Sequence, residues 1–150
     1  MPTTLSILVP LYNERESIGE VLDRIFSRPA EYFASAGIHP EVVVVDDAST
    51  DGSREVVEAY IRSHPSSNVR LLEHARNRGK GCAVRTALAE AHGDFSLIQD
   101  ADLEYDPAEY PSLLRPFLAG EADLVIGSRF LGGDAPKTHF WPTLANRLLT

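Results

Sequence analysis

The chain has 150 residues, a length that suits one domain with a real hydrophobic core. Its hydrophobic fraction of 43% and charged fraction of 24% are typical of a globular protein and argue against disorder. The net charge of −8 opposes a nucleic-acid partner, because nucleic acids bind to basic faces. No transmembrane segment is expected, since every apolar run is far shorter than the ~20 residues that span a bilayer.

The predicted elements alternate along the chain between short β-rich runs and stretches of helical period. Strands are predicted at residues 5–10, 41–45, 69–73, 95–98 and 123–126. Helices are predicted at residues 16–26, from Thr50 or Asp51 to the turn at His64, at 82–91 and at 108–118. This alternation is typical of an α/β fold with a mostly parallel central sheet and helices on both faces.

Three local patterns refine the first half of this prediction. Asn13 and Glu16 have the spacing of a capping box at the start of the first helix. The segment between that helix and the second strand is rich in Pro, Gly and Ser, so it is predicted to be a loop. The unbroken valines of the second strand indicate that both of its faces are buried.

The terminal sequences and the cysteine count indicate the cellular location of the protein and whether its domain is whole. The N-terminus lacks the basic start and long apolar stretch of a signal peptide, and the single cysteine, Cys82, allows no internal disulfide. Both features agree with a cytoplasmic location. No repeat or linker divides residues 1–150, which are predicted to form a single domain. Residues 141–150 resemble the start of a helix whose Leu144, Leu148 and Leu149 have no later partner, so we expect a domain truncated at its C-terminus.

Unusual polar residues follow the predicted strands. In an open parallel sheet, ligands bind beyond the carboxyl ends of the strands, where loops and helix N-termini meet. The residues at these ends are Pro10, Tyr12, Asn13, Glu14, Asp46, Asp47, Asp100, Asp102, Glu104 and Arg129. Arg76, Arg78 and Lys80 add a local basic cluster that could neutralise one small phosphorylated ligand. We therefore expect a ligand site at this edge of the sheet.

Asp100 and Asp102 are candidate metal ligands. In extended chain, residues two apart point the same way, with Cα atoms roughly 6.6 Å apart, so both carboxylates can reach one ion. Glu104 continues the alternation. Hard oxygen ligands without nearby Cys or His suit Mg²⁺ or Mn²⁺, completed by phosphate oxygens and water. The alternative is a polar loop with helix-capping acids, because a D-x-D triplet alone is a weak signal.

The loop after the second strand also has two interpretations. Ser49, Thr50 and Asp51 are explained by a turn and a helix N-cap. One carboxylate of the Asp46-Asp47 pair could instead accept hydrogen bonds from a nucleobase. Tyr12 could stack on a base or close the core, and its place after a strand slightly favours stacking.

Five strings of residues together resemble family-2 glycosyltransferases, particularly the dolichyl-phosphate mannose or glucose synthase branch. The strings are Val9-Pro10-Leu11-Tyr12-Asn13-Glu14, Val45-Asp46-Asp47-Ala48-Ser49-Thr50-Asp51-Gly52, Asn77-Arg78-Gly79-Lys80-Gly81, Asp100-Ala101-Asp102-Leu103-Glu104 and Gly127-Ser128-Arg129. Their order and spacing match over nearly the whole chain, and the five together are far more specific than any one of them.

The resemblance implies a nucleotide-sugar-binding domain of the GT-A (Rossmann-like) type and an inverting transfer from GDP-mannose or UDP-glucose. Pro10, Tyr12, Glu14 and the Val45 backbone would surround the nucleoside, and Asp47 would read the base edge. Asp100 and Asp102 would hold the metal and the ribose-diphosphate end, with Ala101 contributing backbone and Glu104 a further ligand. Arg129 would contact the diphosphate, with Lys80 near the nucleotide. Many mannosyl members carry Gln at the position of Glu104, so this chain adds a negative charge there.

The resemblance also implies an acceptor, a polyprenyl or dolichyl phosphate at the cytoplasmic face of a membrane. A phosphate acceptor is largely ionised at neutral pH, so it needs no general base. An alternative function is a nucleotide-sugar-binding module without turnover, or a fragment that lacks its acceptor half. A phosphorylatable receiver-like domain is a third interpretation, although its acidic pair would follow the first strand rather than the second.

Overall fold

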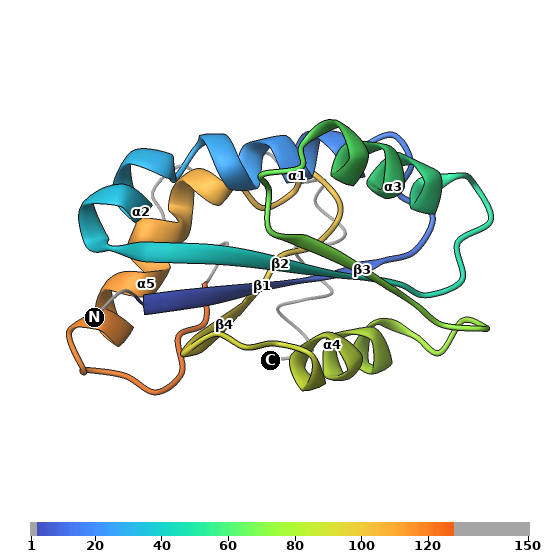
Figure 1. The fold of residues 1–150 in the computed structure, drawn as a ribbon. Helices are drawn as coiled ribbons and strands as arrows, with labels where there is room; N and C mark the ends of the chain where they lie inside the picture. The colour runs from blue at the N-terminus through green and yellow to red at the C-terminus, as the bar shows by residue number, and fades with distance from the viewer. Residues whose placement is uncertain (1–2, 128–150) are drawn as a thin grey trace, which may run out of the picture. The chain divides into compact units, whose positions relative to one another are not determined.

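A computed structural model describes residues 3–127 of the chain. Its elements, in chain order, are β1 (Thr3–Leu11), α1 (Ile18–Ser27), α2 (Ala30–Ala36), β2 (Ile38–Asp46), α3 (Ser53–Ser63), β3 (Val69–Glu73), α4 (Lys80–Ala89), β4 (Phe95–Ile98), the 3₁₀ turn η1 (Pro107–Glu109) and α5 (Tyr110–Leu118) (Figure 1). The chain divides into two compact units, Met1–Pro111 and Ser112–Thr150, and the sheet belongs to the first.

The sheet contains four described strands in the order β3-β2-β1-β4, and every pair is parallel. β1 and β2 pair over their whole lengths, from Thr3 opposite Ile38 to Leu11 opposite Asp46. The first three strands are added in one direction, and β4 then joins the free side of β1. The order therefore reverses between β1 and β4, and this reversal opens a crevice at the carboxyl ends of the strands.

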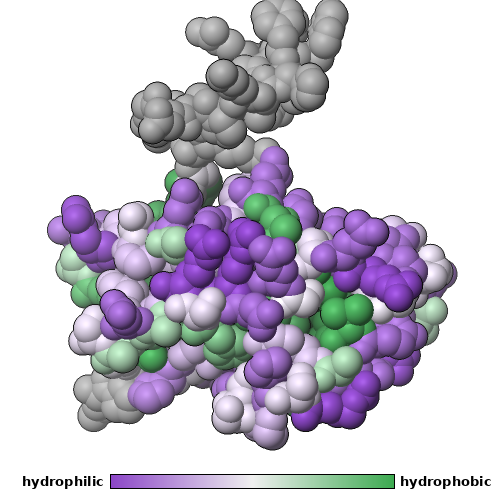
Figure 2. Space-filling model, turned by 90° about the horizontal axis from the view of Figure 1, so that it is seen from above, coloured by the Kyte–Doolittle hydropathy of each residue, from purple (hydrophilic) through white to green (hydrophobic). Residues whose placement is uncertain are grey.

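Helices cover both faces of this sheet, as predicted. α1 and α3 lie on one face and α4 lies on the other (Figure 1). The buried side chains of α1 follow the helical period, at Ile18, Val21, Leu22 and Ile25. Its outward side chains are mostly polar, and the surface on the side of α1 and α3 is largely hydrophilic, with hydrophobic groups in small patches (Figure 2).

The opposite face packs more closely because α4 is built from small residues. Ala83 and Ala87 are fully buried against Leu8, Val43 and Val45. Alanine side chains let the helix axis approach the sheet, which brings the N-terminal end of α4 near the ends of β1 and β2. The valines of β2 are buried on this face and on the α1 side alike, as their unbroken run predicts.

The helix α2 corrects the predicted loop before β2. Pro29 precedes this seven-residue helix, and Gly37 ends it in the left-handed region at φ 67°. Proline at a helix start and glycine just past its end are ordinary helix boundaries, although the same residues also indicate loops. Phe33, which is buried, gives the helix its apolar contact. The composition of this segment therefore misled the sequence prediction.

The predicted fifth strand is also wrong for the described part of the chain. Residues 123–126 form no strand there, and Leu124 and Ile126 are 75% and 80% exposed. A strand needs a neighbour for its N–H and C=O groups, and no strand is described among residues 112–127 of the second unit. A short apolar run alone does not supply such a neighbour.

A buried polar cluster fastens the amino-terminal edge of the sheet, opposite the crevice. Glu41 of β2 accepts hydrogen bonds from Ser6 Oγ and from the His92 backbone N–H, both at 2.6 Å. Ser6 Oγ in turn accepts from Gly93 N–H at 2.8 Å. A Cβ added at Gly93 would lie 2.5 Å from that same oxygen, so only glycine fits this turn. Arg70 of β3 adds a charge 3.4 Å from Glu41.

We expect Glu41→Gln to lower the free energy of unfolding by about 1–3 kcal/mol at neutral pH. Burial acts to raise the pKa of Glu41, but hydrogen bonds from Ser6 and His92 and the charge of Arg70 outweigh it and hold the pKa below its ordinary value. The carboxylate therefore stabilises the fold above the unfolded-state pKa of about 4.3, and this contribution is lost as the pH falls through the folded-state value.

Urea unfolding at about pH 7 and about pH 3 tests this, with exposed Glu31→Gln on α2 as the control. The difference between the Glu41 variant and the unmodified chain should shrink at the lower pH. A difference that grows there would contradict the assignment.

Candidate functional site

A cleft of about 280 Å³ lies at the carboxyl ends of the strands, where the strand order reverses. It approaches the lower end of the range for ligand pockets. It is lined by Pro10, Leu11, Tyr12, Glu14, Asp47, Asn77, Gly79, Lys80, Ala83, Asp100, Ala101 and Asp102. These residues come from the ends of β1, β2 and β4 and from the start of α4. The parallel sheet therefore gathers segments about 90 residues apart into one site.

The loop after β1 is held by the loop after β2. Asn13 N–H donates to Ser49 Oγ at 3.0 Å, and Asn13 Oδ1 accepts from Thr50 N–H at 2.8 Å. Glu14 N–H donates to Ser53 Oγ at 2.8 Å. Asn13 adopts a left-handed φ of 55°, a conformation that asparagine tolerates better than most residues. These bonds present Tyr12 at the cleft with 47% of its surface exposed.

The same contacts correct the predicted capping box. The Asn13 side chain bonds to Thr50 across the loop, while the N-cap of α1 is Ser17, whose side chain makes no capping bond. The predicted cap of the next helix is also corrected, because the N-cap of α3 is Gly52 rather than Thr50 or Asp51. Asp51 Oδ1 accepts from Ser53 N–H at 2.9 Å in the first turn of α3. A sequence spacing cannot distinguish an N-cap from a bond between two loops.

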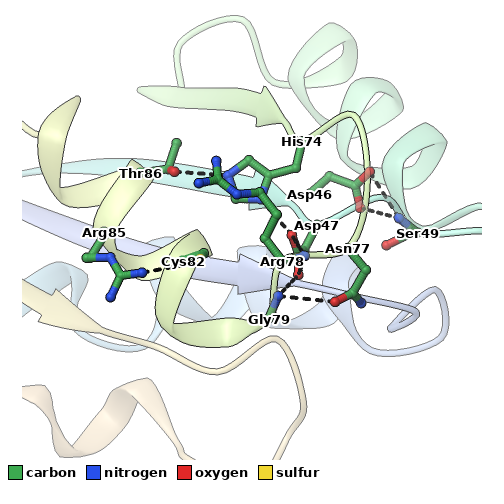
Figure 3. Close-up of polar contacts among 10 residues, drawn as sticks. All are labelled: Asp46, Asp47, Ser49, His74, Asn77, Arg78, Gly79, Cys82, Arg85 and Thr86. Atoms are coloured by element: carbon green, nitrogen blue, oxygen red, sulfur yellow. Dashed lines mark hydrogen bonds and ion pairs between the residues drawn. The ribbon is translucent and has the colours of Figure 1, made fainter.

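Asp47 anchors the loop between β3 and α4. Its carboxylate accepts hydrogen bonds from Arg78 N–H at 2.9 Å, from Gly79 N–H at 2.6 Å and from His74 Nδ1 at 2.6 Å (Figure 3). His74 Nε2 lies 2.9 Å from Thr86 Oγ1 of α4. The carboxylate and the imidazole are both almost completely buried, with 3% and 5% of their side-chain surfaces exposed.

Electrostatics keep this carboxylate ionised. Burial acts to raise the pKa of Asp47, but the hydrogen bonds from His74 and from the Arg78 and Gly79 backbones outweigh it, so the pKa lies below its ordinary value. An ionised carboxylate only accepts hydrogen bonds, so His74 carries its proton on Nδ1. Asp47, although it lines the cleft, uses its oxygens mainly to hold the loop that begins α4.

That loop delivers Lys80 to the acidic segment after β4. Lys80 Nζ lies 2.6 Å from Asp100 Oδ1, and the lysine side chain is 62% exposed, compared with 20% for the aspartate. The N-terminal end of α4 lies at the same place and adds partial positive charge. A cation, a helix N-terminus and two carboxylates thus share one cleft, an arrangement able to bind a phosphorylated ligand together with a metal ion.

Similarity to known proteins identifies the family of this chain. The profile of the family described as glycosyl transferase family 2 matches residues 6–149. The chain belongs to glycosyltransferase family 2. The resemblance inferred from the five motifs is therefore confirmed, and so is the predicted α/β fold of the GT-A type.

Individual members of family 2 are similar over most of this chain. It is 34% identical over 138 residues to a dolichol-phosphate mannosyltransferase of Pyrococcus furiosus, covering 92% of the chain and 36% of that protein. It is 37% identical over 99 residues to a dolichyl-phosphate β-glucosyltransferase of Dictyostelium discoideum, covering 65% of the chain and 30% of that protein. The family-2 chain thus spans about a third of the length of these relatives.

A solved structure has the same fold. The mannosyltransferase PcManGT of Pyrobaculum calidifontis, solved in complex with GDP-Man and Mn²⁺, superimposes with a TM-score of 0.63 at 37% identity. The match covers 79% of this chain and 32% of that one.

Most of the site residues predicted for this family-2 domain lie in the cleft. Pro10, Tyr12, Glu14, Asp47, Lys80, Asp100, Ala101 and Asp102 all line it. Glu104 and Val45 do not: Glu104 lies on the exposed loop beyond, where its N–H donates to Asp102 Oδ1, and Val45 is fully buried. Arg129 lies outside the described residues. The roles assigned to these residues stay predictions.

Two further polar residues at the site were given no role from the sequence: His74, and Asn77, which appears only within one of the five motifs. His74 pairs with Asp47 across 27 residues of sequence, and Asn77 Oδ1 accepts from Gly79 N–H at 3.1 Å. A polar residue one position beyond a strand was the available signal for His74, since β3 ends at Glu73. No local spacing in the sequence pairs this histidine with Asp47.

We expect His74→Leu to lower the free energy of unfolding of this family-2 domain by about 1–3 kcal/mol, because Asp47 loses a buried donor. The loop should loosen first, so amide hydrogen exchange at Arg78 and Gly79 should accelerate. Exchange at Gly93, whose N–H bonds to Ser6 at the far edge, should change only with global stability. His39→Leu, at an exposed position, is the control. Unchanged exchange at Arg78 and Gly79 would refute the anchoring role.

Proposed function

We propose that this chain is the nucleotide-sugar-binding domain of an inverting glycosyltransferase. The enzyme would move a hexose from a GDP-mannose or UDP-glucose type of donor to a polyprenyl or dolichyl phosphate. The observation that carries the proposal is the single cleft that contains Tyr12, Lys80, Asp100 and Asp102. The names of the relatives support the sugar transfer and the lipid-phosphate acceptor.

The donor set fits Mg²⁺ or Mn²⁺. Asp100 and Asp102 supply hard oxygen atoms to the lining of the cleft, and neither Cys nor His lines it. Within residues 3–127, no group of three or more His, Cys, Asp or Glu side chains could hold an ion alone. Such an open site suits cations that bind through one or two carboxylates and take their other ligands from substrate phosphates and water. Mn²⁺ in the PcManGT complex supports the same assignment.

Leaving-group departure places negative charge on the nucleoside diphosphate. A bound cation would act there as a Lewis acid. Lys80 is mostly exposed on a flexible stem, so its ammonium group can turn from Asp100 to a phosphate oxygen. The N-terminal end of α4 offers partial positive charge to the same phosphates, and Arg129 is proposed as a further contact. These groups favour the transition state because they meet charge that the ground state lacks.

The nucleoside would lie on the β1 side of the cleft. Pro10, Tyr12 and Glu14 line that side, and the exposed ring of Tyr12 can stack on a base. Asp47 and the Val45 backbone were predicted to complete the base pocket. Because the Asp47 carboxylate already accepts hydrogen bonds from the β3–α4 loop, we propose that it shapes the pocket by holding that loop. It would accept a hydrogen bond from the base only by giving up one of these loop bonds.

The proposed acceptor explains why no general base is needed. A polyprenyl phosphate is largely ionised at neutral pH, so its oxygen can attack the sugar directly. We propose that the full enzyme works at the cytoplasmic face of a membrane, where such a lipid is available. No helix within residues 3–127 is both long enough and apolar enough to span a bilayer.

We expect GDP or UDP to bind this chain in a metal-dependent manner and Asp102→Ala to abolish that dependence. Isothermal calorimetry with each nucleotide, with and without Mn²⁺, measures both effects. Glu31→Ala, an exposed carboxylate on α2, is the matched control and should bind as the unmodified chain does.

Two results would change this account. The absence of heat with either nucleotide, in the presence of Mn²⁺, would refute the transferase assignment for this chain. Binding without sugar transfer by the full-length protein would favour the alternative function, a nucleotide-sugar-binding module without turnover.

A further inference from the structure

Gln99 is a buried polar residue directly before the acidic segment, and the proposed chemistry does not use it. Only 1% of its surface is exposed. Its Nε2 donates to the backbone oxygen of Asp100 at 3.1 Å and to that of Tyr105 at 3.2 Å. Its Oε1 accepts from the hydroxyl of Tyr110 at 2.7 Å. Its amide group therefore has a protein partner on both of its ends.

The orientation of this amide follows from its partners. Backbone carbonyl oxygens only accept hydrogen bonds, so the amide nitrogen faces Asp100 and Tyr105. Tyr110 is 2% exposed, and burial raises the pKa of its hydroxyl well above the ordinary value. The hydroxyl therefore stays protonated at neutral pH and donates to the amide oxygen.

This geometry closes the loop that carries the metal-ligand candidates. Asp100 and Tyr105 are the two ends of a six-residue segment, and one side chain bonds to both. Other contacts at this segment include the Lys80–Asp100 ion pair, the bond from Glu104 N–H to Asp102 Oδ1 and the Arg28–Asp106 ion pair beyond it, and each involves an exposed group. Exposed pairs of this kind contribute little to order. The buried amide thus fixes both ends of the segment that contains Asp100 and Asp102.

We propose that Gln99 is a positioning residue that sets the separation of the Asp100 and Asp102 carboxylates and thereby the affinity for a divalent cation. This inference rests on the proposed function. Gln99 touches neither the cation nor the sugar donor. It acts through the backbone of the loop, with Tyr110 holding its amide in place.

A role in packing alone does not explain a glutamine here. An apolar side chain of similar length would fill the same space without the cost of burying an amide. That cost is offset only because every partner of the amide is in place, and two of the three are loop carbonyls. The residue therefore specifies the course of this loop.

The test compares Mn²⁺ binding by Gln99→Met with binding by the unmodified chain, at a saturating concentration of GDP or UDP. Methionine keeps the length of the side chain and removes all three hydrogen bonds. We expect the Mn²⁺ dissociation constant, from electron paramagnetic resonance titration of free Mn²⁺, to rise about tenfold or more, as for other residues that orient metal ligands. The dissociation constant of the nucleotide without metal should change less than about twofold, since Gln99 lies outside the cleft lining.

Two further variants separate positioning from stability. Tyr110→Phe removes one of the three hydrogen bonds, so it should raise the Mn²⁺ dissociation constant by a smaller factor, about threefold to fivefold. Glu41→Gln disturbs a buried polar cluster at the opposite edge of the sheet. It should lower stability while leaving Mn²⁺ binding unchanged, because its partners do not touch the acidic loop.

The outcomes are distinguishable. Equal Mn²⁺ affinities for the unmodified chain and for folded Gln99→Met would overturn the role of Gln99 and leave the proposed function intact. If Gln99→Met does not fold, Tyr110→Phe decides, and an unchanged Mn²⁺ dissociation constant in that variant overturns the role. An unmodified chain that binds neither nucleotide with Mn²⁺ would overturn the proposed function and this inference with it.

Discussion

The parallel pairing of β1 with β2 on one side and with β4 on the other is the constraint on which the site depends. It places Leu11 beside Asp46 and Leu8 beside Ile98, so the loops that follow these strands emerge at one edge. Fully buried valines on β2 favour a central position with both faces covered, and this burial opposes any slip of the register. The cleft is thus a consequence of strand order. The same order brings the polar residues of these loops together in the cleft.

Two buried polar anchors hold the loops at that edge. On the β2 side, Asp47 and His74 fasten the backbone that leads into Lys80. On the β4 side, Gln99 bonds to both ends of the segment that contains Asp100 and Asp102. Lys80 and Asp100 then meet between the anchored loops. Loop residues that bind ligands need such support, because the loops themselves bury little apolar surface.

Local patterns were enough to predict the four paired strands and most of the cleft. Apolar runs such as Val42–Val45 and the helical period of α1 are local signals, and the rule that ligands bind at strand carboxyl ends then gathered Tyr12, Asp47 and Asp100. The Asp47–His74 anchor could not be predicted, since its two residues lie 27 apart and no local spacing encodes the contact. The helix α2 was missed because Pro29 and Gly37 indicate a loop and a helix boundary equally well.

The central claim is that Asp100 and Asp102 hold a divalent cation beside a nucleotide diphosphate in this cleft. A crystal structure of the chain with Mn²⁺ and GDP or UDP, with the ion located by its anomalous scattering, tests it most directly. We expect Mn²⁺ to be coordinated by a carboxylate oxygen from this pair, with a diphosphate oxygen among its other ligands and the base against Tyr12. Mn²⁺ bound to other residues, with the nucleotide outside the cleft, would contradict it.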